Sequence, residues 1–452
     1  MENLFDRRRF LQHATILGSL TACRKAHPAL AAEKEPVPQR PEAHPPLGKG
    51  QGIYPGRVVW VHDPKVTDWQ GPGDGHWWQP GRTKQDRLNA MMARAISELT
   101  GQTSPDKAWD KLFRHFNQIH GRGDQGYRTG EKILIKPNWV GFIWRDRNVD
   151  PDSYRLVRRL DYMNTGPQVI IALLGQLVKQ VGVRPSDITV CDSLALLPDE
   201  YYTILREAYP EVRYEDYAGK PGRIKVKPSD VPLYWSCRPQ GVAQDYVPTC
   251  FAEATYVINV ANLKGHTAAG VTLCGKNHFG SLIRWPVQQG YYDMHRGSFN
   301  PQRKAYREQV DLLGHAHLGG KTVLNIIDGI FTGKHYIDPA PRRWKAPPFN
   351  DFWPCSLFVS QDAVALDSVA FDFIWDAWED CARMPRAEDY LHEAALADNP
   401  PSGTFYDPNH PTPTKRLPSL GVHEHWNNSE ERKYSRNLGR PEGIELLYAR
   451  LE

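Results

Sequence analysis

Short apolar runs alternate with amphipathic helical patterns along most of this chain. The runs have strand length and lie at 57–62, 132–136, 187–191, 255–260, 322–327 and 356–360. Apolar side chains recur at helical spacing in 85–119, 167–181 and 199–208, and another helix is expected from Asp362 onward. Almost wholly apolar strands that alternate with helices indicate a mostly parallel sheet with helices on both faces, an α/β fold.

Two internal stretches lack such patterns. Residues 284–306 and 333–354 are rich in Pro, Gly, Arg and aromatic side chains and are long for loops of a compact domain, which favours binding loops or a lid. One α/β domain over 53–390 is therefore expected to carry long irregular, aromatic-rich loops. Residues 391–452 are predicted to be an irregular C-terminal extension packed on that domain, ending in a helix at 441–450.

The first thirty-one residues have the pattern of a twin-arginine export signal. Arg-Arg is followed one residue later by Phe-Leu within 7–11, and the apolar stretch 10–22 comes next. This pattern predicts recognition by the twin-arginine (Tat) machinery and a periplasmic or other extracytoplasmic location. Cys23 follows small residues and could carry a lipid anchor, or cleavage after 29–31 could release the protein. Residues 32–52 are polar and Pro-rich and are expected to be a disordered linker.

Charge changes the picture once this signal is set aside. Residues 1–31 hold five basic and two acidic side chains, which is +3 of the formal net charge of +4. The remaining chain is close to neutral and has no basic stripe, so a nucleic-acid partner is not expected. No later apolar run approaches the length of a transmembrane helix.

The cysteines and histidines offer few metal motifs. No C-x-x-C pair occurs among the six cysteines after Cys23, so no iron–sulfur cluster is indicated, although Cys237 and Cys250 are a conceivable disulfide. His423 and His425 share a face if their segment is extended and could ligate a metal, and His62 at the end of a predicted strand is another candidate.

Polar side chains follow four of the predicted strands. They are Lys136 and Asn138, then Asp192, then Asn262, Lys264 and His266, and finally Asp328. Because ligands of open parallel sheets bind at the carboxyl ends of the strands, the pattern indicates one shared site. The alternative is a set of separate polar caps exposed to solvent.

A Gly-rich stretch at 270–280 lies between two of these strands. Residues 270–277 nearly match the phosphate-binding loop G-x-x-x-x-G-K-[ST], but Asn277 replaces the hydroxyl residue and the stretch is too far from the preceding strand. A nucleotide triphosphatase is therefore not expected, and a backbone nest for an anion stays open.

These residues carry a family resemblance. Lys136-Pro-Asn138, Asp192, 262–266, 275–280 and the segment from Asp362 to Asp367 resemble the domain-of-unknown-function family 362 (DUF362) over roughly 57–375. The K-x-H and K-N-x-x-G pair is the most specific element. The resemblance implies an α/β fold and a polar site at these positions, without an assigned reaction. Some relatives look to carry ferredoxin-like cluster domains, which are not found here. The resemblance also implies that a cofactor inserted before export is the usual reason for the twin-arginine route.

The sequence thus predicts an exported protein that binds an anionic small molecule, or a metal or organic cofactor, at the strand ends. Lys264, Lys276 and His266 are the candidate catalytic residues, with the lysines holding negative charge and His266 moving protons. The candidate cofactor-binding residues are Lys136, Asn138, Asp192, Asn262, Asn277, Asp328 and Asp367.

Structural alternatives accompany these roles. Each lysine could have the purely structural role of pairing with an acid, and His266 could be a core side chain. Asp362 is well suited to cap its helix. Whether the protein is an enzyme stays open, and a non-catalytic ligand-binding, cofactor-chaperone or scaffold protein is the rival hypothesis.

Overall fold

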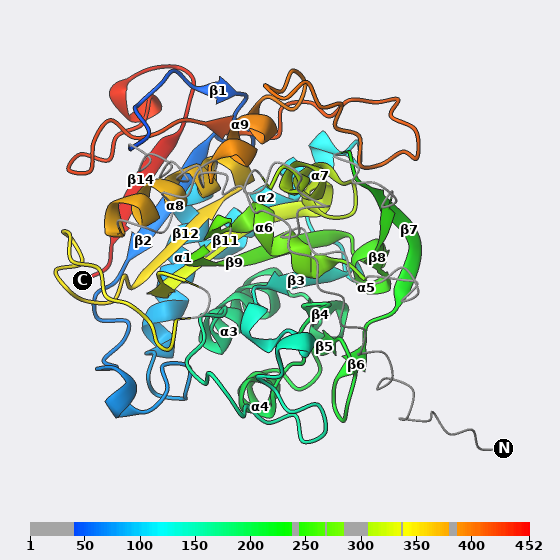
Figure 1. Cartoon of the computed structure of the whole chain (residues 1–452), viewed down its shortest axis with the longest axis vertical. Coiled ribbons are helices and arrows are strands. Elements are labelled where there is room, and N and C mark those ends of the chain that lie inside the picture. The colour runs from blue at the N-terminus through cyan, green and yellow to red at the C-terminus, as the bar shows by residue number, and fades with distance from the viewer. Residues whose placement is uncertain (1–39, 237–243, 267–268, 284–305, 336–337, 379–386) are drawn as a thin grey trace, which may run out of the picture. The chain divides into compact units, whose positions relative to one another are not determined.

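A mixed ten-stranded sheet organises the part of the chain that the structure describes. The computed structural model describes residues 40–236, 244–266, 269–283, 306–335, 338–378 and 387–452. The strands follow one another in the order β14-β2-β12-β11-β9-β3-β4-β5-β6, and β10 pairs with β9 (Figure 1). β12 is antiparallel to both neighbours and β10 to β9, whereas the other pairs are parallel. The predicted α/β fold with a mostly parallel sheet is confirmed.

The strands of this sheet have the following bounds. They are β2 (Arg57–His62), β3 (Ile133–Pro137), β4 (Ile188–Cys191), β5 (Arg213–Asp216), β6 (Ile224–Lys225), β9 (Tyr256–His266), β10 (Gly270–Thr272), β11 (Thr322–Gly333), β12 (Ser356–Ser360) and β14 (Glu445–Arg450). Two smaller pairs join β1 (Leu47–Gly48) to β13 (Val422–His423), and β7 (Pro228–Tyr234) to β8 (Gln244–Pro248).

Successive side chains of β2 show why both faces of the sheet are covered. Val59 and Val61 belong to one buried cluster, and Val58 and Trp60 to another. Because side chains alternate across a strand, a run that is apolar throughout needs a packed layer on each face.

Helices supply the two layers. On one face lie α1 (Gln85–Thr100), α2 (Pro105–Ile119), α3 (Pro167–Gly175) and α4 (Asp199–Ala208). On the other lie α6 (Cys274–Asn277), α7 (Glu308–Gly314), α8 (Ala363–Ala377) and α9 (Asp389–Ala395), while α5 (Thr249–Glu253) packs near β7 and β8. The helical pattern over 85–119 is divided after Thr100, where Gly101 adopts a left-handed conformation with φ of 64°. Among the described residues, no helix has the length and apolar character needed to cross a membrane.

Two central strands are longer than the sequence pattern predicted. β9 continues to His266 because β10 folds back on it and pairs with its last three residues. β11 continues past Asp328 to Gly333, with an irregular register between these two residues. Asn262, Lys264, His266 and Asp328 therefore lie within strands rather than after them.

The two ends of the described chain differ from the expectation. The predicted disorder of 32–52 is wrong for the residues from Arg40 onward: β1 pairs with β13, and the backbone N–H of Gln51 donates to the Asp362 carboxylate. The helix predicted at 441–450 is also wrong, because Glu445–Arg450 forms β14, an edge strand parallel to β2. In both segments the structure depends on backbone pairing with distant parts of the chain, which the local sequence pattern does not indicate. Residues 1–39 lie outside the described residues.

The expected binding loops are partly described. Residues 284–305 lie outside the described residues. The 338–354 part of the second stretch is mostly irregular and helps to line a cavity of about 800 Å³, to which Arg343, Trp344 and Lys345 contribute. Arg432, from the C-terminal part of the chain, completes the basic side of this cavity.

Candidate functional site

A buried ion pair lies where β3 and β4 end side by side. The Nζ atom of Lys136 is 3.0 Å from Oδ2 of Asp192, and the two side chains are 0% and 6% exposed. Backbone N–H groups of Trp139 and Leu194 also donate to the Asp192 carboxylate. Parallel pairing of β3 with β4 brings the two residues together, as expected for neighbouring strand ends.

Amide side chains extend this pair across the sheet. Lys136 Nζ donates to Oδ1 of Asn277, which also accepts from Nδ2 of Asn138 at 3.0 Å. Oδ1 of Asn138 in turn accepts from Lys264 Nζ at 2.6 Å. Asn277 donates back to the Lys136 carbonyl and to Asn259. We call Lys136, Asn138, Asp192, Lys264 and Asn277 the strand-end network.

Lys264 differs from Lys136 in the charge of its partners. It is 0% exposed and donates to Asn138 Oδ1 and to the carbonyl of Met163, two neutral acceptors. Burial together with Lys276 and Lys136 lowers the pKa of Lys264 well below its ordinary value, against the opposing effect of Asp328 and Asp192. A buried lysine of this kind gives up its proton readily or gains strongly from an added negative charge.

Asp328 has the larger effect of the two acids whose charges raise the pKa of Lys264. Its carboxylate accepts the backbone N–H groups of Gly166 and Ile330 at 2.8 and 3.1 Å. Burial raises the pKa of Asp328 to about 7, and the two backbone hydrogen bonds and Lys264 oppose that rise. Near neutral pH this carboxyl group can therefore hold or release a proton.

The Gly-rich stretch does not form a phosphate loop. Gly270–Thr272 is strand β10, and the short helix α6 follows it. The backbone N–H groups of Cys274 and Gly275 at the start of α6 donate to Asp367, whose pKa burial raises to about 6. Asp367 thus fills the position that a bound anion would take, so the expectations of an anion nest there and of a cofactor-binding Asp367 are not supported. Its role is to hold α6, which carries Asn277.

The other candidate residues are buried as well. Lys276 and His266 are 7% and 4% exposed, and His266 Nδ1 accepts the backbone N–H of Ala269. Asn262 donates through Nδ2 to the carbonyl of Asp328, and its buried Oδ1 has no hydrogen-bond partner among the described residues. Asp362 caps α8 by accepting the Ala365 N–H, which confirms the structural role considered for it.

Sequence reasoning missed one glycine that the network requires. A Cβ atom at Gly280 would lie 2.7 Å from Oδ1 of Asp192 and 3.0 Å from Nζ of Lys136. The carbonyl of Gly280 also accepts the Ser193 N–H. Gly280 therefore lets the backbone approach the ion pair closely, and the K-N-x-x-G motif was its signal.

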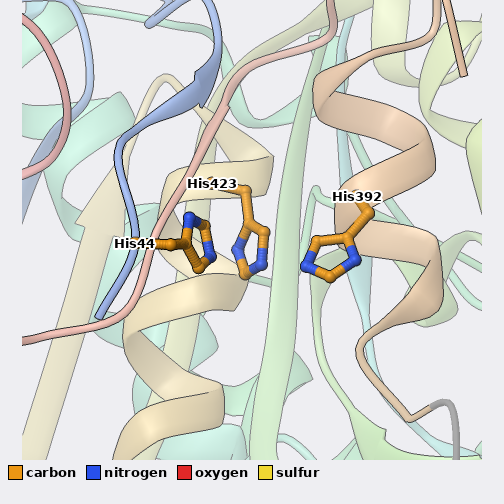
Figure 2. Close-up of side chains that lie close together, drawn as sticks. All are labelled: His44, His392 and His423. Carbon is orange, nitrogen blue, oxygen red and sulfur yellow. The ribbon is translucent and has the colours of Figure 1, made fainter. Parts of the chain in front are cut away.

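A second polar cluster gathers histidines from distant parts of the chain. Figure 2 shows His44, His392 and His423 side by side. One ring nitrogen from each of the three lies within 4.8 Å of the others. A carboxylate oxygen of Glu388 and one nitrogen each of His423 and His425 also lie within 4.8 Å of one another. His425 bonds to Asp372 at 2.7 Å and to Glu388 at 3.0 Å. We call His44, His392 and His423 the histidine cluster.

The histidine cluster contains one of the three predicted metal candidates, His423, and a second candidate, His425, lies beside it. The third, His62, is not among the described groups of three close ligand atoms, and its ring lies beside Tyr448. Burial lowers the pKa of His62 to about 4. His44 and His392 were missed because the first stood in an expected linker, and nothing in the sequence links either residue to His423.

The described cysteines are free thiols. They are Cys191, Cys250, Cys274 and Cys355, and Cys191 and Cys250 lie close to Glu215. Cys237, the conceivable disulfide partner of Cys250, lies outside the described residues.

Comparison with known families supports the resemblance noted in the sequence. The model of the domain of unknown function DUF362 matches residues 133–372, more than half of the chain. The chain belongs to the DUF362 family. No curated protein matches it, so the comparison assigns no activity. The DUF362 match contains the whole strand-end network, whereas His44, His392, His423 and His425 lie outside it.

Proposed function

We propose that this DUF362 protein binds an anionic small molecule, a carboxylate or phosphate, at the strand-end network after export from the cytoplasm. The observation that carries this proposal is Lys264, a fully buried lysine with neutral hydrogen-bond acceptors. A buried charge is stable only when it is paired or neutralised. An anion beside Lys264 would supply the missing negative charge.

The charges around Lys264 support the choice of an anion. Besides burial, four side chains shift the pKa of Lys264: Lys276 and Lys136 lower it, and Asp328 and Asp192 raise it. Asp192 already neutralises Lys136 through the direct ion pair. Asp328 is then left to oppose the positive charge of Lys264, and it is partly protonated near neutral pH.

The same arrangement suggests how a bound ligand could exchange a proton. A ligand carboxylate or phosphate near Lys264 favours the ammonium form, and Asp328, with a pKa of about 7, can supply or accept the proton. His266, at the end of β9, is the further candidate for proton transfer. These groups would act in an enzyme; the rival function is a binding protein that releases its ligand chemically unchanged.

Ligand binding is tested with inorganic phosphate and small carboxylates on the full chain, by calorimetry in two buffers of different ionisation enthalpy. We expect binding coupled to proton uptake, because the anion raises the pKa of Lys264. Lys264→Met should abolish binding, and Lys179→Met, which removes an exposed lysine, should leave it unchanged. Equal binding by wild type and Lys264→Met would reject the site. Mass spectrometry of ligand recovered after incubation separates turnover from simple binding.

Export is the second part of the proposal. It rests on the twin-arginine pattern at 7–11, and replacement of Arg7 and Arg8 by Lys should leave the protein in the cytoplasmic fraction. Labelling with a radioactive fatty acid, with Cys23→Ala as control, distinguishes a lipid-anchored protein from a released one. Export of the double Lys variant at the wild-type level would exclude the twin-arginine route.

A further inference from the structure

Three elements that are far apart in the sequence build the histidine cluster. His423 ends β13, and β13 pairs antiparallel with β1, so that Leu47 lies opposite His423 and His44 is only three residues away. His392 lies on α9, which packs against both β1 and β13. The ring centroids of His44 and His423 are 5.1 Å apart, and those of His392 and His423 are 4.8 Å apart (Figure 2).

Hydrogen bonds fix which nitrogen of His423 carries the proton. The Ser368 hydroxyl donates to the carbonyl of Val364 at 2.7 Å and lies 2.8 Å from Nδ1 of His423. A hydroxyl has one hydrogen and the carbonyl can only accept, so Nδ1–H of His423 must donate to Ser368. In the neutral ring, Nε2 of His423 then presents a lone pair. This atom is buried and has no hydrogen-bond partner among the described residues.

His44 shows the same arrangement. Its Nδ1 lies 2.8 Å from the carbonyl of Pro45, which can only accept, so Nδ1 carries the proton. Nε2 of His44 is likewise buried and has no hydrogen-bond partner in the described part of the chain. In their neutral form, these two neighbouring histidines thus present Nε2 lone pairs that no group in the described part of the chain satisfies. Buried polar atoms normally have a hydrogen-bond partner, so two adjacent nitrogens without one indicate a site for a bound group.

A proton donor would satisfy one such nitrogen, but a cation satisfies several at once. Metal-bound histidines typically donate their other ring N–H to a carbonyl, carboxylate or hydroxyl group, as His44 and His423 do here. A zinc ion bound by nitrogens at 2.0–2.1 Å in tetrahedral geometry has ligand atoms about 3.3 Å apart. The 4.8 Å limit within which the three ligand atoms lie is close enough for small ring movements to reach this spacing.

We propose that His44, His392 and His423 bind one divalent transition-metal ion of the zinc class. Three imidazoles suit Zn²⁺, Co²⁺, Ni²⁺ or Cu²⁺ and do not suit Mg²⁺ or Ca²⁺, which take oxygen ligands. A cavity of about 190 Å³ is lined in part by His44 and His425 and so lies beside the cluster. This site is independent of the strand-end network.

The acids beside the cluster fit a cation as well. Glu388 lies four residues before His392, and its carboxylate oxygen is within 4.8 Å of ligand nitrogens of His423 and His425. His425 bridges Glu388 and Asp372 and so holds both carboxylates near the cluster. Carboxylates only accept, so His425 donates through both ring nitrogens and cancels one of the two negative charges. The net charge of these three groups is therefore negative, which favours a cation over an anion at the cluster.

The test uses the untagged full chain, stripped of metal by chelation and then titrated with Zn²⁺, and with Co²⁺ for its visible absorption. We expect one tightly bound Zn²⁺ per chain and the spectrum of nitrogen-ligated Co²⁺. His44→Ala and His392→Ala should each weaken Zn²⁺ binding by about 100-fold or more. Ser368→Ala, which removes only the group that orients His423, should weaken it by about 10–100-fold.

Control variants separate metal binding from folding. His315→Ala removes a buried histidine outside the cluster, whose Nε2 faces the carbonyl of Pro232, and should retain wild-type Zn²⁺ affinity. Melting curves of each metal-free variant verify folding. Zn²⁺ should raise the melting temperature of wild type and of His315→Ala, but not that of His44→Ala or His392→Ala. Absence of stoichiometric Zn²⁺ binding by wild type would overturn the proposal. So would wild-type affinity in His44→Ala and His392→Ala, because the ion would then sit at Glu388, His423 and His425.

Discussion

Lys136→Met tests whether the strand-end ion pair supports the fold. The substitution keeps a long side chain but removes the charge that faces Asp192 at 3.0 Å. Asp192 would stay buried, with the backbone N–H groups of Trp139 and Leu194 as its remaining donors. Removal of one partner of a buried ion pair costs about 3–5 kcal/mol, because the other charge is left uncompensated.

The remaining contacts of Lys136 set where in this range the effect should fall. The two backbone donors retained by Asp192 reduce the cost, while the carbonyl of Pro137 and Oδ1 of Asn277 each lose a donor. Oδ1 of Asn277 keeps its bond from Nδ2 of Asn138, so at most the Pro137 carbonyl is left unsatisfied, which costs about 1–3 kcal/mol. We therefore expect Lys136→Met to lower the free energy of unfolding by about 4 kcal/mol, near the middle of the range.

The assay is guanidinium unfolding followed by circular dichroism and by tryptophan fluorescence, with free energies compared where the two transitions coincide. The free energy of unfolding of the double variant Lys136→Met/Asp192→Asn should fall by about 1–3 kcal/mol less than the sum of the decreases in the two single variants. Arg114→Met, which breaks an exposed pair with Asp110, should cost less than about 0.5 kcal/mol. A loss below about 1 kcal/mol for Lys136→Met, or strict additivity, would refute the structural role and leave Lys136 available for a ligand.

Two further substitutions test neighbouring features. Gly280→Ala should lower the melting temperature and destabilise the protein by about 1–3 kcal/mol, because the new Cβ would crowd Asp192 and Lys136. Gly73→Ala is the control, because a Cβ at Gly73 has open space around it. Equal melting temperatures of the two variants would contradict the expected crowding. Asp328→Asn tests a carboxyl group whose pKa rises on folding to about 7, so that its contribution to stability falls as pH increases from about 4 to about 7. In unfolding titrations across this pH interval, the free energy of unfolding of wild type should fall by up to ~4 kcal/mol relative to that of Asp328→Asn. A difference in unfolding free energy that does not change with pH would show that the carboxyl group titrates normally.

The layered fold could be predicted because its signal is local. The uninterrupted apolar run of β2 places Val58 and Trp60 on one face and Val59 on the other, which requires helices on both sides. The same reasoning failed for residues 445–450. This half-buried edge strand mixes polar and apolar residues, so its pattern fits a helix as well as a strand. Pairing with β2, which lies nearly four hundred residues earlier, decides between the two.

The candidate sites divide in the same way. Lys136, Asp192 and Lys264 lie on neighbouring strands, and the rule for parallel sheets was sufficient to group them. The role of Asp367 was not predictable, because it depends on how α8 meets the start of α6. Only part of the histidine cluster could be predicted from the sequence. His423 belongs to an H-x-H pattern, whereas His44 lies beside it only because β1 pairs with β13.

Helix α8 connects these two sites. Asp367 holds the start of α6, which carries Asn277 of the strand-end network, and the next residue, Ser368, orients His423. One turn later Asp372 binds His425. Changes that displace α8 as a whole are therefore expected to disturb both sites together. Variants of His44 and Lys264 each touch a single cluster, so loss of Zn²⁺ binding in one and of anion binding in the other is the pattern that two independent sites require.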